Sequence, residues 1–448
     1  MRILAIYRHY WPDRTPYARL LRTILEHRAG SARCTVFTAQ PSYNGASEAA
    51  PREETLGGVR VVRGWTPRER KRFVVSRVLA NVWFLAAAVV FAWRTRRDYD
   101  VLLANVHPPV LMGLTLRVIS RLTGKPFILH MQDIHPEASI AVGVMRDSWR
   151  TRLLRRIDAG NCAAAWRVVT LCEDMKRTLL TRDGFDATDR VRVVNNFALE
   201  SFAPPRLAAT GGSADAGRAD DVESRNRPPC VPLDPRRNAP VRSRLNGTAP
   251  FRLLFAGNLG RFQNLPRLVD AARRLGEGYE IVFMGAGLMR EELRSLAADV
   301  PNVTFLDQAP VEAAVEQMRQ SDLGVVSLSP GVCRVAYPSK SMTYLSAGLP
   351  LLALVEDDSD LADEVRKHDF GYAAGQVDGE ALAAAVRAAA ADRHRWDAAA
   401  RAELADRAGR VFGSARALAA WDEVAGEWAG EFNSTGFPCV TTRSRRAA

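Results

Sequence analysis

The sequence predicts an α/β protein with two doubly wound, Rossmann-like domains, each built on a parallel sheet. At 448 residues the chain is too long for one ordinary hydrophobic core. Short apolar runs alternate with helical stretches in both halves, as expected for parallel sheets covered on both faces. The chain also begins such a domain twice, with MRILAIYRHYWP at residue 1 and FRLLFAGNLGRF at residue 251.

The first half is expected to form a domain over residues 1–202. Its apolar runs, interpreted as strands, are MRILAIY, VRVVRG, DVLLANV, PFILHM, RVVTLC and VRVVNN. The first run starts at residue 1 without the basic, apolar and cleavage regions of a secretory signal, so we expect a cytoplasmic protein. The six cysteines form no CxxC pair, so neither a zinc cluster nor a disulfide framework is expected.

The second half is expected to repeat the pattern over residues 251–414. Its apolar runs are FRLLFAG, YEIVFMG, VTFLDQ, LGVVSL and PLLALV. Between the first two, five apolar residues fall on one helix face: Leu265, Leu268, Val269, Ala272 and Leu275. A C-terminal helix is expected over residues 415–431 and a flexible tail over 432–448. Residues 203–250 are expected to be a disordered insertion, because their Pro, Gly, Ala, Arg and Asp cannot offset the ordering entropy.

The positive charge of the chain is concentrated in the first half. The formal net charge is +12, and residues 1–200 hold 32 Lys and Arg against 18 Asp and Glu, a net +14. This asymmetry indicates an anionic partner, although a compositional preference for arginine would give the same count. No basic-aromatic module for nucleic acid is visible, so an anionic membrane surface is the expected partner.

Residues 68–97 contain the longest apolar stretch. The uncharged part, residues 78–93, falls short of the roughly 20 residues that a membrane-spanning helix needs. Basic clusters at both ends, with Trp83 and Trp93 between them, predict a helix over residues 73–97 that lies on a membrane surface. A helix buried in the first domain is the alternative interpretation.

Three features of the second half are typical of a phosphate site. The turns AGNLGRFQN (256–264) and MGAGLMREEL (284–293) follow expected strands, and their glycines are predicted to leave backbone N–H groups free for a phosphate. Glycine used only for packing is the alternative. In AYPSKSMTYLSAGLPLLALV (336–355), Pro338 predicts a helix start and Gly348 its end. Lys340 then lies in the first turn, where a buried cation is poorly placed unless an anion shares the site.

The strings NVHPPVLMG, HMQDIHPEASIAVG, RVVNNF, FAGNLGRFQN, VFMGAG and YPSKSMTYLSAGLP occur in this order. Together they resemble the retaining GT-B glycosyltransferases of glycosyltransferase family 4, especially members that build bacterial exopolysaccharide, capsule, O-antigen and colanic acid. The resemblance covers nearly all of residues 1–431 except the insertion. It implies two Rossmann-like domains facing across a cleft, with a nucleotide-sugar donor held mainly by the second and an acceptor by the first.

The family's donor-site residues are only partly present. Its pair of glutamates would fall on Val335 and Thr343, so Thr343 is left to bond a ribose hydroxyl. Its diphosphate-binding Arg and Lys correspond to Asn258 and Gln263, which shifts the neutralisation of charge to Lys340. The donor-binding residues implied are Gly257, Asn258, Gly260, Arg261, Gln263, Gly285, Gly287, Arg334, Lys340 and Thr343.

Charged and polar side chains follow the expected strand PFILHM in the first domain. His130 ends this strand, and Asp133, His135 and Glu137 lie in the next loop, a combination expected at a sugar site. The resemblance implies that His130 contacts the donor sugar and that Asp133 and Glu137 orient the sugar or the acceptor. A metal site is the competing interpretation, although these enzymes generally need none. His135 is as well explained by a structural role at the following helix.

The sequence therefore predicts a metal-independent, retaining hexosyltransferase without a cofactor. Its expected substrates are a nucleoside-diphosphate sugar and a lipid-linked saccharide acceptor, in bacterial surface polysaccharide biosynthesis. The expected location is the inner face of the cytoplasmic membrane, with no nucleic-acid partner. Two alternatives are a sugar-nucleotide 2-epimerase of the same fold and a non-catalytic nucleotide-sugar-binding protein.

Overall fold

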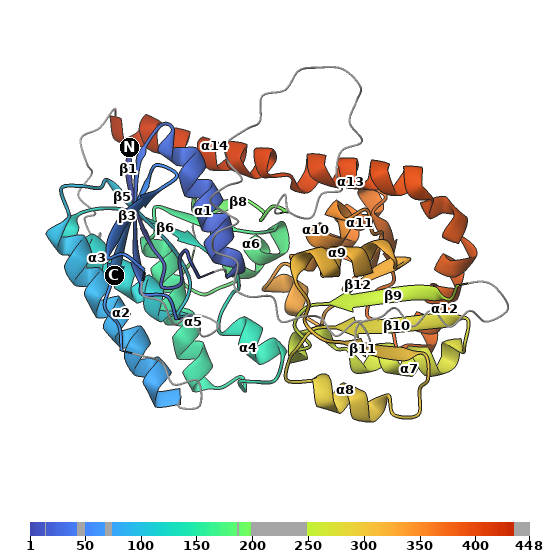
Figure 1. Cartoon of the computed structure of the whole chain (residues 1–448). Coiled ribbons are helices and arrows are strands. Elements are labelled where there is room, and N and C mark those ends of the chain that lie inside the picture. The colour runs from blue at the N-terminus through green and yellow to red at the C-terminus, as the bar shows by residue number, and fades with distance from the viewer. Residues whose placement is uncertain (14, 43–49, 68–73, 186–187, 199–248, 434–448) are drawn as a thin grey trace, which may run out of the picture. The chain divides into compact units, whose positions relative to one another are not determined.

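A computed structural model describes residues 1–13, 15–42, 50–67, 74–185, 188–198 and 249–433 (Figure 1). The expected insertion over residues 203–250 and the expected tail over 432–448 lie almost wholly outside the described residues. The chain divides into two compact units. Unit 1 comprises Met1–Phe197, Pro330–Pro338 and Val411–Ala448, and unit 2 comprises Ala198–Ser329 and Ser339–Arg410.

Unit 1 is built on an eight-stranded sheet with the strand order β3-β4-β2-β1-β5-β6-β7-β8. Every neighbouring pair is parallel except β3 and β4, which form an antiparallel pair. The strands are β1 (Arg2–Ile6), β2 (Arg33–Ala39), β3 (Glu53–Leu56), β4 (Val59–Gly64), β5 (Val101–Asn105), β6 (Phe127–His130), β7 (Arg167–Thr170) and β8 (Val191–Val193). All residues of β5, β6 and β7 are buried, because helices cover both faces of the central strands.

The helices of unit 1 come from both ends of the chain. They are α1 (Pro16–Ala29), α2 (Val74–Arg94), α3 (Leu111–Thr123), α4 (Glu137–Ala141), α5 (Trp149–Ala164), α6 (Glu173–Leu180) and α14 (Ser414–Asn433). The helix predicted over residues 415–431 is thus present as α14, and it packs within unit 1. The helix predicted over residues 73–97 is present as α2.

Unit 2 is built on a six-stranded sheet in which all neighbours are parallel, with the order β11-β10-β9-β12-β13-β14. The strands are β9 (Phe251–Ala256), β10 (Tyr279–Met284), β11 (Val303–Leu306), β12 (Leu323–Ser327), β13 (Leu351–Leu354) and β14 (Gly371–Ala373). The helices are α7 (Pro266–Leu275), α8 (Arg290–Leu296), α9 (Val311–Arg319), α10 (Lys340–Ser346), α11 (Asp360–Lys367), α12 (Gly379–Ala391) and most of α13 (Ala398–Phe412).

Both sheets confirm the predicted doubly wound topology. In unit 2 the strand order reverses between β9 and β12, and in unit 1 it reverses between β1 and β5. Ligands of such sheets bind outside the carboxyl ends of the strands at this switch point. The five apolar residues predicted to share one helix face all lie in the buried core around α7: Leu265, Leu268, Val269, Ala272 and Leu275. The predicted helix after Pro338 is α10, and Gly348 beyond its end is left-handed (φ +73°).

Candidate functional site

Lys340 lies at the carboxyl edge of the unit 2 sheet, as the first residue of α10. Its ammonium nitrogen is 3.6 Å from the ring centroid of Phe255, at the end of β9. The chain passes close by at Gly257, where an added Cβ would lie 2.9 Å from the Lys340 Cε. The nitrogen is buried, and among the described residues it has no hydrogen-bond partner.

Burial lowers the pKa of Lys340 to about 7, since a low-dielectric environment disfavours the charged amine. The Phe255 ring offers a cation–π contact, but an aromatic face replaces only part of the lost hydration. A buried ammonium without an anion is costly, and a phosphate that entered this space would supply the missing charge and hydrogen bonds. The geometry therefore favours an anion at this position.

The two glycine-rich turns meet backbone to backbone. Gly257 N–H donates to Met284 O (2.8 Å), and Leu259 N–H donates to Ala286 O (2.8 Å). Gly285 (φ +138°) and Gly287 (φ +158°) have positive φ, and a Cβ on either would overlap the backbone of the first turn. These glycines are thus required for close packing of the two turns.

The expectation that these turns hold a phosphate with free amides is wrong for three of the glycines. The N–H groups of Gly257 and Gly285 donate to neighbouring strands and turns, and the N–H of Gly260 donates to Gln263 Oε1 (3.1 Å). Gln263 is therefore occupied in shaping its own turn. Asn258 and Arg261 are exposed at this edge, and Thr343 is half-buried on α10.

The sequence analysis missed a second cation at the same edge. Arg267, in the first turn of α7, is buried, and its guanidinium donates to Ser327 Oγ (3.0 Å), Leu328 O (3.0 Å) and Leu354 O (2.8 Å). Desolvation lowers its pKa to about 10, although the charge of Glu356 opposes this. Lys340 was predicted because it is a basic residue in the first turn of a helix. Arg267 has the same position in α7, so the same criterion could have found it.

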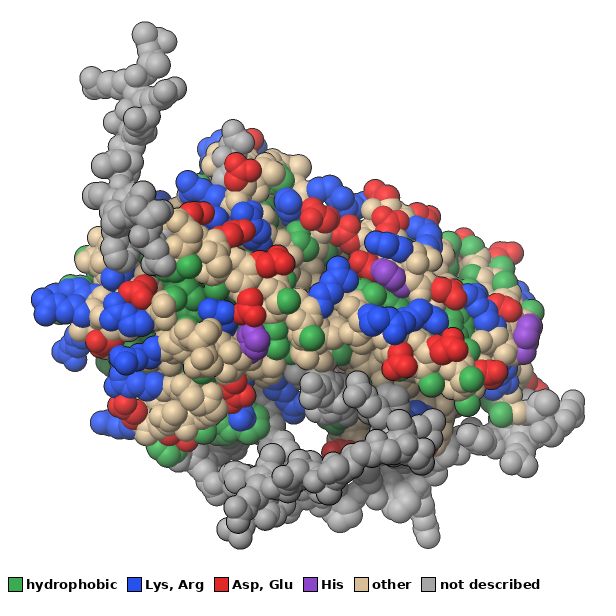
Figure 2. Space-filling model, turned by 90° about the horizontal axis from the view of Figure 1, so that it is seen from above, with side chains coloured by type: hydrophobic (Ala, Val, Ile, Leu, Met, Phe, Trp, Pro, Cys, Tyr) green, Lys and Arg blue, Asp and Glu red, His purple; other side chains and the backbone are tan. Residues whose placement is uncertain are grey.

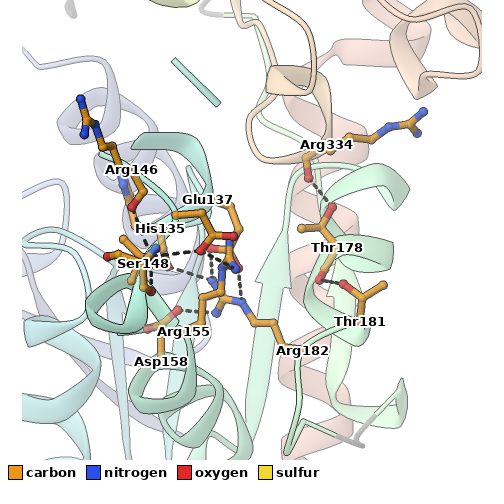
Figure 3. Close-up of polar contacts among 12 residues, drawn as sticks. His135, Glu137, Arg146, Ser148, Arg155, Asp158, Thr178, Thr181, Arg182 and Arg334 are labelled. Atoms are coloured by element: carbon orange, nitrogen blue, oxygen red, sulfur yellow. Dashed lines mark hydrogen bonds and ion pairs between the residues drawn. The ribbon is translucent and has the colours of Figure 1, made fainter. Parts of the chain in front are cut away.

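Arg334 lies in the segment Pro330–Pro338, which belongs to unit 1. Its guanidinium forms an ion pair with the buried carboxylate of Asp174, and its carbonyl accepts a hydrogen bond from Thr178 Oγ1 (2.7 Å; Figure 3). The next residue, Val335, accepts from the Ile134 N–H (2.8 Å) through its carbonyl. The guanidinium of Arg334 is thus already paired with Asp174, and the predicted contact with a diphosphate would compete with this ion pair.

His130 ends β6 as predicted, and it lies in a buried polar chain. Its Nδ1 is 3.1 Å from Tyr17 Oη, and its Nε2 is 2.9 Å from the amide nitrogen of Gln132. Because the amide donates to Nε2, Nδ1 carries the proton, and Asn196 holds the Gln132 carbonyl oxygen in turn (2.8 Å). Burial lowers the pKa of His130 to about 3. The ring is therefore neutral and fixed.

Glu137 is bound in an ion-pair cluster with Arg182, which Figure 3 shows pointing at the carboxylate. Arg182 donates to both Glu137 oxygens (2.9 and 2.6 Å), to Asp158 Oδ2 (2.7 Å) and to the His135 carbonyl (2.8 Å). Desolvation opposes the charge of Arg182, but the hydrogen bond with Glu137 and the charge of Asp158 outweigh it and raise the pKa. This cluster fixes the loop that follows β6.

The remaining polar residues of that loop have separate surroundings. Asp133 is an exposed residue, and its backbone pairs with Ala336. Surrounding protein atoms still desolvate its carboxyl group and raise the pKa, while the charge of His135 opposes the shift. His135 Nδ1 contacts Ser139 Oγ (3.2 Å) in α4, which agrees with the structural interpretation of this histidine. Within either unit, the described residues bring together no group of three His, Cys, Asp or Glu side chains that could share a metal ion.

The chain is similar in sequence to known glycosyltransferases. Residues 15–196 match the family described as "Glycosyl transferase 4-like domain". The "Probable glycosyltransferase WbjE" of Pseudomonas aeruginosa is 25% identical over 325 residues, which cover 71% of this chain and 72% of the relative. The "Putative colanic acid biosynthesis glycosyl transferase WcaI" of Escherichia coli K12 is 22% identical over 367 residues, which cover 78% and 82%. These similarities support a GT-B glycosyltransferase.

Solved structures show the same fold. Anabaena Alr3699/HepE in complex with UDP and glucose matches with a TM-score of 0.63 at 14% identity, over 96% of this chain and 100% of that chain. Sucrose-phosphate synthase from Thermosynechococcus elongatus matches with a TM-score of 0.69 at 15% identity, over 97% and 100%. The GT-B fold class, with two Rossmann-like domains, is thereby confirmed. The expected placement of the domains across a cleft stays a prediction.

Proposed function

We propose that this protein is a retaining, metal-independent hexosyltransferase that uses a nucleoside-diphosphate sugar. The observation that supports this most directly is the buried Lys340 ammonium, which has no hydrogen-bond partner among the described residues and lies at the carboxyl edge of the unit 2 sheet. HepE, which shares the fold, has been crystallised with UDP and glucose, and UDP carries the diphosphate that such a cation would bind.

Lys340 would stabilise the charge that develops on the departing diphosphate. Preorganised charge in a water-poor site usually makes the largest contribution to reactions of this kind. Arg261 is exposed at the same edge and is a second candidate contact for the phosphates. No residue is assigned as a covalent nucleophile, so retention would follow from attack on the same face of the sugar.

In unit 1 we assign His130 a positioning role. Its two nitrogens hold Tyr17 and Gln132, so the ring orients the Gln132 amide at the end of β6. Asp133 is the exposed residue of this loop, and Gln132 beside it is half-buried. We propose that these two side chains bind hydroxyls of the transferred sugar or of the acceptor. Glu137 would act through the Arg182 cluster that shapes the loop.

We propose a lipid-linked saccharide as the acceptor, at the inner face of the cytoplasmic membrane. The name of WcaI refers to colanic acid biosynthesis, and WaaG, which shares the fold, is a glycosyltransferase of lipopolysaccharide biosynthesis. Both polymers belong to the bacterial surface, which supports a role in surface polysaccharide synthesis for this chain.

The test is the turnover of a panel of nucleotide sugars by the wild-type protein and by Lys340→Met. Loss of a charged hydrogen bond to phosphate should weaken nucleotide-sugar binding about 10- to 100-fold, as measured by calorimetry. The free energy of unfolding should not fall, because Met replaces a buried amine that has no hydrogen-bond partner among the described residues, and Met can still pack against Phe255. Lys367→Met, on the exposed surface of α11, is the matched control. Equal binding by wild type and Lys340→Met would refute the phosphate role.

The finer parts of the proposal have separate readouts. The anomeric configuration of the product, followed by NMR, distinguishes retention from inversion. Full activity in the presence of EDTA is expected for a metal-independent enzyme. Conversion of the donor without any acceptor would instead indicate the epimerase, and binding without consumption in the presence of acceptor lipids would indicate a non-catalytic protein.

A further inference from the structure

Large exposed apolar side chains are concentrated in one part of the fold. Of the 16 such side chains in the described residues, 14 lie between Trp65 and Leu153, all in unit 1. The other two, Leu288 and Leu296, lie in unit 2. Scattered apolar residues on a surface need no explanation, but a cluster of this size marks an interaction site.

Helix α2 has a buried face and an exposed apolar face. Ala80, Phe84, Ala88 and Ala92 recur every four residues and are fully buried, and the Phe84 ring stacks on Phe37 of β2 (5.7 Å between centroids). The opposite face exposes seven large apolar side chains: Val75, Val78, Leu79, Val82, Trp83, Val90 and Trp93. The helix is therefore packed on the domain along one face, as the alternative interpretation expected, while its outer face is apolar and exposed. Its contact with a membrane stays a prediction.

Two neighbouring helices that the sequence analysis did not connect with α2 also expose large apolar side chains. Helix α3 packs beside α2, and α5 packs beside α3 (Figure 1). Helix α3 exposes Leu111, Val118 and Leu122 at intervals of seven and four, and α5 exposes Trp149 and Leu153 at an interval of four. We call the exposed residues of α2, α3 and α5 the three-helix face.

The charge of the three-helix face has one sign. The three helices contain eight arginines and a single acid, Asp158, which is buried against Arg182. Six of the arginines are exposed: Arg77, Arg94, Arg121, Arg150, Arg152 and Arg156. Elsewhere the charges are mixed, as on the face in Figure 2, where basic and acidic side chains lie among one another. On α14, Asp422 and Glu427 pair with basic residues.

We infer that the three-helix face is a docking surface for a bilayer rich in anionic phospholipids. Exposed Trp, Leu and Val suit the interface between headgroups and acyl chains, and the unopposed arginines suit phosphate headgroups. The inference rests on the proposed function, in which the acceptor is lipid-linked, and adds the surface that brings the enzyme to it. By length and composition alone, Val75–Arg94 is also apolar enough to cross a membrane. The contacts of Phe84 and the alanines within unit 1 favour a helix lying on the surface.

The test measures sedimentation of the full-length protein with vesicles of phosphatidylcholine, with and without phosphatidylglycerol. Two variants address the helices that extend the surface: Leu122→Glu with Leu153→Glu, and Arg121→Gln with Arg152→Gln and Arg156→Gln. We expect the first pair to reduce partitioning more than tenfold and each arginine to contribute about fivefold on anionic vesicles. Leu296→Glu, on exposed α8, is the matched control and should bind like the wild type.

Tryptophan fluorescence gives a second readout. Lipids brominated in their acyl chains should quench emission of the wild type, because Trp83, Trp93 and Trp149 enter the interface. Added salt should weaken binding, since it screens the arginines. Equal binding by all variants, or binding that only detergent reverses, would overturn the docking surface. So would a stable dimer that the Leu122 and Leu153 substitutions dissociate.

Nucleotide-sugar binding is measured by calorimetry on the same preparations. Normal donor binding by a protein that remains in the supernatant would overturn the docking surface and leave the proposed function standing. Vesicle binding by a protein that does not bind any nucleotide sugar would support the surface and contradict the proposed function.

Discussion

Burial lowers the pKa of Lys340 to about 7 and the pKa of His130 to about 3. Their surroundings nevertheless differ. Both nitrogens of His130 have hydrogen-bond partners, so the neutral ring needs no ligand to satisfy its polar atoms. The Lys340 amine has none among the described residues, so its surroundings are completed only when an anion arrives.

The pKa of Lys340 predicts how nucleotide-sugar affinity changes with pH. Above pH 7 the free protein holds a neutral amine, and the diphosphate prefers the cation, so binding must take up a proton. Affinity should therefore fall as pH rises above 7, by at most about tenfold per pH unit. Calorimetry in buffers of different ionisation enthalpy measures both the affinity and the proton uptake.

Folding stability should change in the opposite direction over the same window. The unfolded chain keeps this lysine protonated up to its ordinary pKa of 10.5, and the folded chain releases the proton near 7. Stability contributed by this group therefore rises with pH between these values. Lys340→Met should remove this group's contribution to the pH dependence of both nucleotide-sugar affinity and folding stability. A nucleotide-sugar affinity of the wild type that does not change between pH 7 and 10.5 would contradict the assignment.

At the scale of elements, the close packing of the two glycine-rich turns of unit 2 means that one added methyl group should lower the free energy of unfolding strongly. In Gly285→Ala the Cβ would overlap the carbonyl of Gly257, and the backbone has a positive φ of +138°. We expect a loss of about 3 kcal/mol or more in the free energy of unfolding, together with weaker nucleotide binding, because the turn beside Lys340 must move.

A second variant, Gly124→Ala, separates the cost of a positive φ from the cost of steric overlap, which Gly285→Ala combines. Gly124 is also left-handed (φ +70°), but no neighbouring atom of the described part of the chain lies within 4 Å of its added Cβ. Its cost should be about 1–2 kcal/mol. Denaturant unfolding of both variants gives the comparison, and equal losses would show that the close approach of the turns is unimportant.

The Arg182 cluster joins α4, α5 and the end of α6. The side chains of Arg182, Asp158 and Glu137 are 3%, 4% and 15% exposed, so removal of the cation leaves two carboxylates with little water. Arg182→Met should destabilise unit 1 by about 3–5 kcal/mol. Arg33→Met, at an exposed position of β2, should change the unfolding free energy by less than about 0.5 kcal/mol. A thermal scan that finds both variants equally stable would rule out the structural role of the cluster.

At the scale of the whole molecule, the fold could be predicted because it depends on patterns that repeat along the chain. Apolar runs gave eleven of the fourteen strands in the described residues, and the periodic face beside and along α7 was found residue by residue. The strands β2, β3 and β14 were missed. The candidate site was less predictable, because it depends on contacts between distant segments. The amides of Gly257 and Gly285 are used by strands and turns that no local pattern reveals, and Asp174 lies 160 residues from the Arg334 it binds.

The membership of the units was also hidden from the sequence. Residues 330–338 return to unit 1 from within unit 2, and residues 411–433 return to it after unit 2 has been formed. No composition change marks these returns, since they are decided by tertiary pairs such as Val335 with Ile134 and Trp421 with His130. The first domain is therefore complete only when the last helix has been made.

Helix α14 is held in unit 1 by ion pairs whose loss can be measured. Glu427 accepts from Arg167 on β7 (2.6 Å) and from Arg192 on β8 (2.7 Å). Desolvation alone would raise the pKa of Glu427, but the hydrogen bonds from Arg192 and Arg167 outweigh it and lower the pKa. The stabilisation is thus present above the ordinary pKa of 4.5 and is lost as pH falls below it.

Glu427→Ala should accordingly speed amide hydrogen exchange in α14 and in β7 and β8, with a cost of about 1–3 kcal/mol at neutral pH. Exchange in β9 to β14 should remain unchanged, because these strands belong to unit 2. Glu403→Ala, at an exposed position of α13, serves as the control. If Glu427→Ala accelerated exchange equally in both sheets, the two units would unfold as one body, and α14 would stabilise the whole chain rather than the first domain alone.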